Sequence, residues 1–145
     1  MAPGAVLFVC RHNAIRSPMA AALTRAAFPS IYTRSAGVDP GAQDPFVVEV
    51  MGEKGLDVSG RRPRTLEELS DTGFDLVVTL APEAHHHVLD LARTQSFQVE
   101  YWPVFDPSSM QGSRAQILDS YRACRDTLDA KIRKRFSETV KDWNA

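Results

Sequence analysis

Apolar residues along the chain fall into short runs that alternate with helical patterns. The runs at 6–9 and 74–80 are rich in valine, leucine and phenylalanine. Continuous apolar runs of this length are typical of strands that are buried on both faces. Two further segments, 31–35 and 98–104, are also predicted to be strands, which makes four in all.

Helices are predicted between these strands. Ser17-Pro18 begins the first one, because serine can cap the first amides and proline is tolerated in the first turn. An alanine-rich stretch follows over 19–28, and Pro29 ends it. Three more helices are expected, at 46–54, 65–71 and 82–93.

The last helix is predicted to start at Ser113, which forms a capping box with Gln116. Apolar residues then recur every three or four positions and form one stripe along the helix. The stripe consists of Ile117, Tyr121, Cys124, Leu128, Ile132 and Phe136. Such a stripe indicates a helix that packs on the core, with Cys124 inside it.

Strand and helix alternate throughout, which favours an α/β fold with a parallel sheet and helices on both of its faces. In such sheets the ligand binds beyond the carboxyl ends of the strands. The loop after the first strand is therefore the first place to look for chemistry, and this loop begins with Cys10.

Length and composition fit one ordinary domain covering residues 1–145, with 43% hydrophobic and 24% charged residues. A net charge of −1 gives no reason to expect nucleic acid or a membrane surface as a partner. No apolar run approaches a membrane span, and the start of the chain does not have the pattern of a signal peptide. We expect a cytoplasmic protein.

The chain offers no obvious metal or cofactor site, and none is expected. Its two cysteines, Cys10 and Cys124, do not form a Cys-x-x-Cys pair. Three adjacent histidines at 85–87 would point about 100° apart on a helix, so they cannot share one ion. The arginine-rich run at 61–64 is interpreted as a solvated turn.

The loop between Cys10 and Arg16 joins a strand end to a helix start. Unpaired amides and the helix dipole make such a loop a site for anions, and the guanidinium of Arg16 matches a tetrahedral oxyanion. Positive surroundings favour the ionised form of a cysteine, so we expect Cys10 to be a thiolate, with Ser17 donating to it. The simpler alternative is that Cys10 is a small buried hydrophobe. The residues expected to bind the anion are Arg11, His12, Asn13, Ala14, Ile15, Arg16 and Ser17.

The segment Cys-x5-Arg-Ser, with an inner asparagine and a following Pro-Met-Ala, resembles the low-molecular-weight protein tyrosine phosphatases. It is also similar to the thioredoxin-coupled arsenate reductases, which share their fold. Further matching segments are Ser35-Ala36-Gly37, Gly55-Leu56-Asp57, Phe74-Asp75, Thr79-Leu80, Trp102-Pro103 and Asp106-Pro107. The resemblance covers nearly the whole chain and implies a flavodoxin-like domain with a four-stranded parallel sheet of order 2-1-3-4.

The resemblance also implies a role for each site residue. Cys10 is the nucleophile that forms a phosphocysteine, and Arg16 with the amides of 11–16 binds the phosphoryl oxygens. Asn13 holds the loop in a left-handed conformation, and Ser17 assists the thiolate. Asp106 is the general acid and base, although Asp-Pro after a strand is also a common turn opener.

Some residues depart from the resemblance and guide the choice of function. The arsenate reductases need resolving cysteines after the third strand, where this chain has none. We therefore expect a phosphatase acting on phosphorylated protein, with phosphotyrosine as the expected group, or on a small phosphomonoester. Ser108 and Ser109 stand where the phosphatases have aromatic walls. The alternatives are an arsenate reductase using an external thiol and a non-catalytic anion-binding module. We expect a monomer or weak dimer.

Overall fold

The computed structural model describes residues 3–39, 41–70 and 73–144, with 138–144 described by their backbone alone. Four parallel strands form its central sheet, in the order β2-β1-β3-β4 that the resemblance implied. The strands are β1 (Ala5–Cys10), β2 (Tyr32–Gly37), β3 (Leu76–Thr79) and β4 (Gln98–Tyr101). The predicted fold class, an α/β fold of the flavodoxin-like type, is confirmed.

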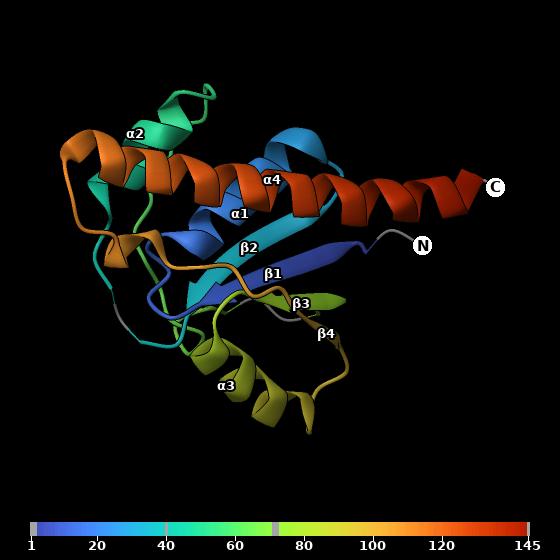
Figure 1. Cartoon of the computed structure of the whole chain (residues 1–145). Helices are drawn as coiled ribbons and strands as arrows, with labels where there is room; N and C mark the ends of the chain where they lie inside the picture. The colour runs from blue at the N-terminus through green and yellow to red at the C-terminus, as the bar shows by residue number, and fades with distance from the viewer. Residues whose placement is uncertain (1–2, 40, 71–72, 145) are drawn as a thin grey trace.

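Helices cover the two faces of the sheet unequally (Figure 1). On one face lie α1 (Arg16–Ala27), α2 (Pro45–Gly52) and α4 (Arg114–Asn144). The other face carries α3 (Pro82–Ala92). Alternate residues of the strands face the two layers, so Phe8 joins the first core and Leu7 the second. The first core is the larger of the two.

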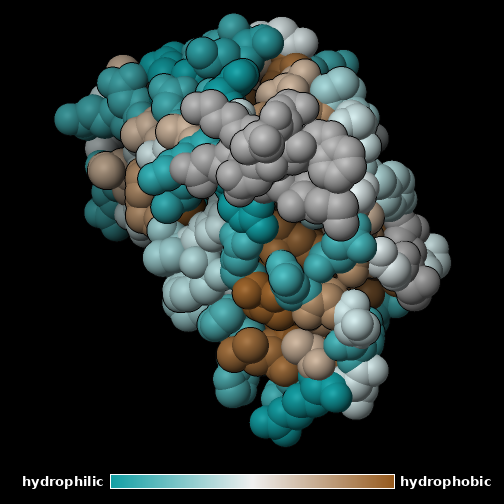
Figure 2. Space-filling view, turned by 90° about the vertical axis from the view of Figure 1, so that its right-hand side faces the viewer, coloured by the Kyte–Doolittle hydropathy of each residue, from teal (hydrophilic) through white to brown (hydrophobic). Residues whose placement is uncertain are grey.

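The amino ends of the strands form one end of the molecule. Figure 2 looks at this end and shows hydrophobic side chains gathered below the grey atoms. Tyr32 begins β2, stacks on Phe74 with ring centroids 6.2 Å apart and is half exposed. Cys10 is the last residue of β1, so it lies at the opposite end of the sheet.

The helix that we expected at 65–71 is not present over 65–70, and residue 71 lies outside the described part of the chain. Thr65 instead forms a parallel bridge with Gly37, and the amide of Leu66 donates to the carbonyl of Gly37. Pairing with the end of β2 satisfies backbone groups that a helix would have used. A turn follows, closed by bonds between Thr65 and Glu68.

The last helix has the predicted start and the predicted buried stripe. The amide of Ser113 donates to Gln116 Oε1, and the amide of Gln116 donates to Ser113 Oγ, which is the capping box. Cys124, Leu128 and Ile132 are fully buried in the first core. Among the helices of the described residues, none has the length and apolar character needed to cross a membrane.

Strand register brings three loops to the carboxyl edge of the sheet. Cys10 pairs with Gly37, while Val9 pairs with Thr79, which in turn pairs with Tyr101. The strands β1, β3 and β4 therefore end at nearly the same level. Residues 11–15, 80–81 and 102–106 follow these ends and meet at the left-hand side of Figure 1.

Candidate active site

The Cys10 thiol lies at the floor of the first of these loops and is 3% exposed. Its Sγ is 3.0 Å from Ser17 Oγ, and either atom can donate this hydrogen bond. We expected Ser17 to cap α1, but the helix already begins at Arg16, with Ile15 at its N-cap and no side-chain capping bond. The hydroxyl of Ser17 is directed at the sulfur instead, so it serves the site rather than the helix end.

Asn13 holds the middle of the loop. Its φ of 54° is the left-handed conformation that the resemblance implied and that asparagine tolerates. The side-chain amide nitrogen donates to Ser17 Oγ and Ser35 Oγ, both at 2.9 Å. The side-chain oxygen accepts from the amide of Arg64 at 2.9 Å and from the guanidinium of Arg61. Asn13 is fully buried, so these bonds fix the loop against β2 and against the segment 61–64.

Arg61 is a site residue that the sequence analysis missed. We interpreted the run 61–64 as a solvated turn, but Arg61 is only partly exposed and also donates to the carbonyl of Asn13 at 3.0 Å. Burial lowers the pKa of Arg61 to about 10, while the charge of a thiolate at Cys10 opposes this shift. Arg61 therefore holds the Cys10 loop through its bonds to Asn13, and its charge adds positive potential near the Cys10 sulfur.

We expect Asn13→Ala to lower the free energy of unfolding by about 2–4 kcal/mol, because it leaves several buried polar groups without a partner. Urea denaturation followed by circular dichroism measures this change. Ser35→Ala is the matched control, since it removes a single one of these bonds, and we expect about 1 kcal/mol from it. Equal losses for the two variants would contradict the central position of Asn13.

Arg16 connects the loop to the other two strand ends. Its Nη1 donates to the carbonyls of Leu80 and Val104, at 3.2 and 2.9 Å, and its side chain is 10% exposed. The second terminal nitrogen, Nη2, lies 3.8 Å from Asp106 Oδ2. The guanidinium is thus held by two carbonyls, with Nη2 turned toward a carboxylate at the rim.

Asp106 lies after β4, at the edge predicted for it, and its side chain is 43% exposed. Its Oδ1 accepts from the amide of Ser108 at 2.9 Å and from the Ser108 hydroxyl at 2.7 Å, which caps a short 3-10 helix, η1 (Pro107–Ser109). The interpretation of Asp106 as a turn opener is therefore confirmed, and its role as general acid and base stays a prediction. One oxygen opens a turn, and the other faces Arg16.

The remaining loop residues form the rim of the site. Arg11 and His12 are exposed, while Ala14 and Ile15 are partly buried. Arg11 is 3.5 Å from Asp39 and 3.8 Å from Glu83 in two exposed ion pairs. No hydrogen bond runs from the backbone amides of 11–15 to another residue within the described part of the chain. Unpaired amides before a helix start are the donors that an oxyanion needs.

Gly37 is required where β2 meets this loop. A Cβ at this position would lie 2.7 Å from the amide nitrogen of Asn13 and 2.9 Å from the carbonyl oxygen of Arg11. Both are backbone atoms and cannot move aside without moving the loop. The Ser35-Ala36-Gly37 segment therefore has a physical reason for its glycine, which is the close approach of the backbone around Cys10.

Cys124 and the three histidines remain outside this arrangement. The Cys124 thiol is buried, and its Sγ is 3.8 Å from the carbonyl oxygen of Phe105. Burial raises the pKa of this thiol to about 12, although the Arg16 guanidinium opposes the shift. His85 bonds to Thr79 at 2.9 Å, whereas His87 pairs with Glu67 at 3.7 Å. Within the described residues, no three side chains that could hold a metal come together.

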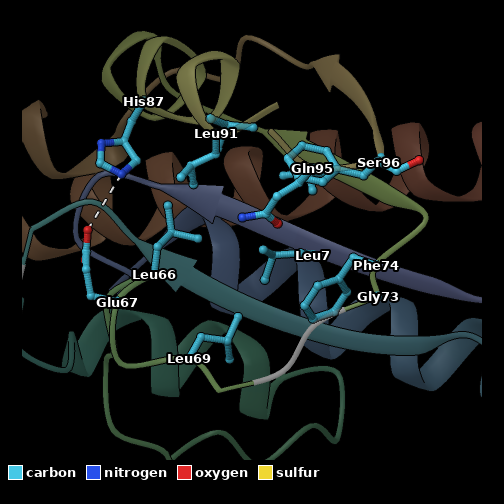
Figure 3. Close-up of a pocket in the computed structure, with 13 residues that line it drawn as sticks. Leu7, Leu66, Glu67, Leu69, Gly73, Phe74, His87, Leu91, Gln95 and Ser96 are labelled. Atoms are coloured by element: carbon cyan, nitrogen blue, oxygen red, sulfur yellow. Dashed lines mark ion pairs between the residues drawn. The ribbon is translucent and has the colours of Figure 1, made fainter. Parts of the chain in front are cut away.

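An apolar pocket of about 620 Å³ lies on the α3 face of the sheet, away from Cys10. Figure 3 shows Leu66 and Leu69 on one side of it and Leu91 of α3 on the other, with the Glu67–His87 pair at one end. Among the described residues that line this pocket there is no cysteine and no arginine. It therefore lacks the groups that the Cys10 loop brings together, and the loop is the better candidate for chemistry.

A sequence profile of the family described as "Low molecular weight phosphotyrosine protein phosphatase" matches residues 5–145. The chain belongs to this family. Since the match begins at β1 and includes α4, it covers every strand and helix of this low molecular weight phosphatase fold.

Named relatives of this phosphatase family member have two kinds of activity. A probable low molecular weight protein-tyrosine-phosphatase, EpsP of Ralstonia nicotianae, is 37% identical over 81% of this chain and 78% of its own length. An arsenate reductase of Halalkalibacterium halodurans is 29% identical over 94% of this chain and 96% of its own. Relatives of this chain therefore include both a probable phosphatase and an arsenate reductase.

A solved structure of YwlE, an arginine phosphatase of Bacillus subtilis, has the same fold. It is 27% identical, with a TM-score of 0.76, and covers 95% of this chain and 97% of its own. That structure is of a cysteine-to-serine mutant with a phosphorylated active-site serine.

Proposed function

We propose that this protein is a phosphatase that hydrolyses phosphomonoesters through a phosphocysteine at Cys10. The observation that carries the proposal is the contact of 3.0 Å between Cys10 Sγ and Ser17 Oγ, at the base of a loop with unpaired amides. A hydroxyl that donates to sulfur stabilises the thiolate, and a thiolate below a bound phosphoryl group is placed for attack on phosphorus. The phosphorylated serine in the YwlE mutant supports the same assignment.

The proposed reaction has two displacements. Sulfur attacks phosphorus, and as the S–P bond forms the P–O bond to the leaving group breaks. Asp106, protonated at Oδ2, gives its proton to the leaving oxygen. Water then attacks phosphorus while the Asp106 carboxylate takes a proton from it, the P–S bond breaks, and phosphate leaves with the thiolate restored.

Arg16 supplies the charge that both steps need. Two carbonyls hold its Nη1, so little side-chain entropy remains to be lost when its other donors bind phosphoryl oxygens. Donors fixed in this way before the reaction stabilise the charge that develops on the equatorial oxygens. No step requires a metal ion, so we expect turnover in the presence of a chelator.

The substrate that we propose is protein phosphotyrosine, with a small phosphomonoester as the wider class. Ser108 and Ser109 do not offer aromatic walls, but Phe105 directly precedes Asp106 and is 50% exposed. Met110 is also half exposed on the other side of η1. These two exposed apolar side chains precede and follow the segment 106–109 in the sequence, which supports binding of an aryl leaving group near Asp106.

A panel of substrates tests this proposal. It contains a phosphotyrosine peptide, p-nitrophenyl phosphate, a phosphoarginine peptide and small phosphorylated metabolites, each assayed for released phosphate in a chelator. We expect turnover, with the tyrosine peptide preferred. Preference for phosphoarginine would correct the substrate, whereas no release from any member would favour the non-catalytic anion-binding module.

Arsenate reduction with an external thiol is the second candidate, and the similarity to arsenate reductases favours it. Arsenate has the shape and charge of phosphate and fits the same loop. A reductase must regenerate its nucleophile by thiol exchange, which requires an accessible thiolate. Cys124 is buried, with a pKa of about 12, so it is a poor resolving thiol. Production of arsenite that rises with added carrier thiol would identify this activity.

We expect Cys124→Ala to leave phosphate release within about twofold of the unchanged protein, while the cavity lowers stability by about 1–2 kcal/mol. Steady-state assays and urea denaturation measure the two effects separately. If Cys124 were a resolving thiol, the variant would lose arsenite production while keeping its phosphatase turnover. Loss of both activities in a folded variant would contradict the structural role given to this cysteine.

A further inference from the structure

A second cavity, of about 600 Å³, opens beside the edge strand β2. Three separate segments contribute to it, which are the end of α1 with the turn after it, β2 itself, and the run 61–64. We call it the arginine pocket. Its lining residues are Arg25, Pro29, Ile31, Tyr32, Thr33, Arg34, Ser35, Arg61 and Arg64.

Four arginines line the pocket, and they come from three parts of the fold. Burial lowers the pKa of Arg25, and the charges of Arg34 and Arg64 lower it further. Burial also lowers the pKa of Arg61 to about 10, with Arg64 and Arg25 acting in the same direction. Arg25 is therefore within electrostatic reach of the other three guanidinium groups. No aspartate or glutamate is found among the described residues that line the cavity.

Hydrogen bonds to backbone and side-chain oxygen atoms hold two of these arginines, Arg25 and Arg61, in the pocket. Arg25 donates from Nε and Nη2 to the carbonyl of Thr33, at 3.2 and 2.9 Å. Arg61 donates to the carbonyl and the side-chain oxygen of Asn13. These acceptors are neutral. A partly buried group of cations held by neutral acceptors is costly, and a bound anion would offset the cost.

We propose that the arginine pocket binds a small polyanion with two or more phosphate groups, separately from the Cys10 loop. Planar guanidinium groups bind phosphate oxygens in pairs, and several that converge favour a ligand with more than one phosphate. An extended acidic peptide fits less well. Arg25 covers the carbonyl of Thr33 and residues 64–66 cover Gly37, so little of the β2 edge remains for an added strand.

Arg61 connects this pocket to the Cys10 loop. The same guanidinium that lines the pocket also fixes Asn13, which in turn bonds to Ser17. A polyanion that draws Arg61 toward itself weakens its bonds to Asn13 and loosens the loop. Binding in the pocket is therefore expected to reduce kcat, whereas competition within the Cys10 loop would raise KM.

Inorganic tripolyphosphate is the probe for binding, titrated calorimetrically into the full chain carrying Cys10→Ser at near-physiological salt. We expect Arg25→Gln and Arg64→Gln each to weaken binding by about tenfold, which is the effect of losing one charged contact. Arg93→Gln is the matched control, because Arg93 is exposed on the other face of the sheet and pairs only weakly with Asp90. Arg25→Lys keeps the charge but loses the planar pair of donors, so its affinity should lie between those of the unchanged protein and Arg25→Gln.

Unchanged affinity in both glutamine variants, confirmed as folded by thermal melts, would overturn the proposal. Binding that orthophosphate displaces completely and that Arg64→Gln does not affect would assign the probe to the Cys10 loop alone. Since calorimetry needs no turnover, this result stands even if the proposed phosphatase activity fails. In the active protein, tripolyphosphate should lower kcat for p-nitrophenyl phosphate, and Arg25→Gln should remove that effect. A pure rise in KM would contradict the link through Arg61.

Discussion

Cys10→Ser should reduce the turnover of p-nitrophenyl phosphate by about four orders of magnitude or more. A serine hydroxyl stays protonated at neutral pH and attacks phosphorus far more slowly than a sulfur anion does. The replacement is nearly isosteric, so the contact with Ser17 and the bonds of Asn13 remain possible. The loss therefore reports on the reacting atom rather than on the loop. Steady-state release of p-nitrophenolate measures it.

Binding gives the control for this variant. Because the amides of the loop and Arg16 are unchanged, we expect Cys10→Ser to bind orthophosphate within a few-fold of the unchanged protein. Mass spectrometry should also find some phosphoserine at position 10 after incubation with substrate, as in the YwlE mutant. Turnover that stays within tenfold of the unchanged protein would remove Cys10 from the role of nucleophile, whatever the state of the loop.

The parts of this fold that the sequence predicted best are those that depend on local pattern. The apolar runs before Cys10 and around Val77 form strands because their side chains have cores on both sides of the sheet. The Ser113–Gln116 capping box is written in four consecutive residues and forms as expected. Cys10 and Arg16 are likewise close in sequence, so their common loop needs no long-range information.

Two of the errors, at Arg61 and Thr65, concern residues whose partners are distant in the sequence, whereas the partners of Ser17 lie in its own loop. Arg61 bonds to Asn13 across 48 residues, and nothing within the run 61–64 distinguishes this arginine from a solvated one. Thr65 joins the edge of β2 instead of starting a helix, because Gly37 offers it a backbone partner. Ser17 precedes a proline, as a helix cap often does. Its hydroxyl instead forms hydrogen bonds with Cys10 Sγ and the side-chain amide of Asn13.

The Cys10 loop therefore has a local and a tertiary part. The local part, from Cys10 to Ser17, supplies the proposed nucleophile, the amides and the guanidinium. The tertiary part is the set of bonds around Asn13, which comes from β2 and from the segment 61–64. Sequence reasoning predicts the first part from the spacing of Cys10 and Arg16 between a strand and a helix start, together with the family resemblance. The bonds around Asn13 depend on the fold, because the register of β2 against β1 brings Gly37 beside Cys10.

Asp106→Asn should lower kcat for a phosphotyrosine peptide by about two to three orders of magnitude, with a smaller loss, about tenfold, for p-nitrophenyl phosphate. Tyrosine leaves poorly unless its oxygen receives a proton, whereas p-nitrophenolate is a weak base and leaves without one. An asparagine oxygen can still accept from Ser108, so η1 should remain formed. Both kcat values are measured on the same preparation. A misfolded variant would lose activity equally on the two substrates, so the ratio of the two losses reports on proton donation alone.

Ser108→Ala tests the turn around Asp106 separately from the proposed proton donation by Asp106. This variant removes the hydroxyl bond to Asp106 Oδ1 and leaves Oδ2 facing Arg16, so we expect a modest loss, about two- to fivefold, that is the same for both substrates. Equal losses for the two substrates in Asp106→Asn would show that Asp106 acts only as a turn residue and through its charge near Arg16. A dependence on the leaving group would show instead that its exposed oxygen donates the proton, because only a proton donor distinguishes a strongly basic leaving oxygen from a weakly basic one.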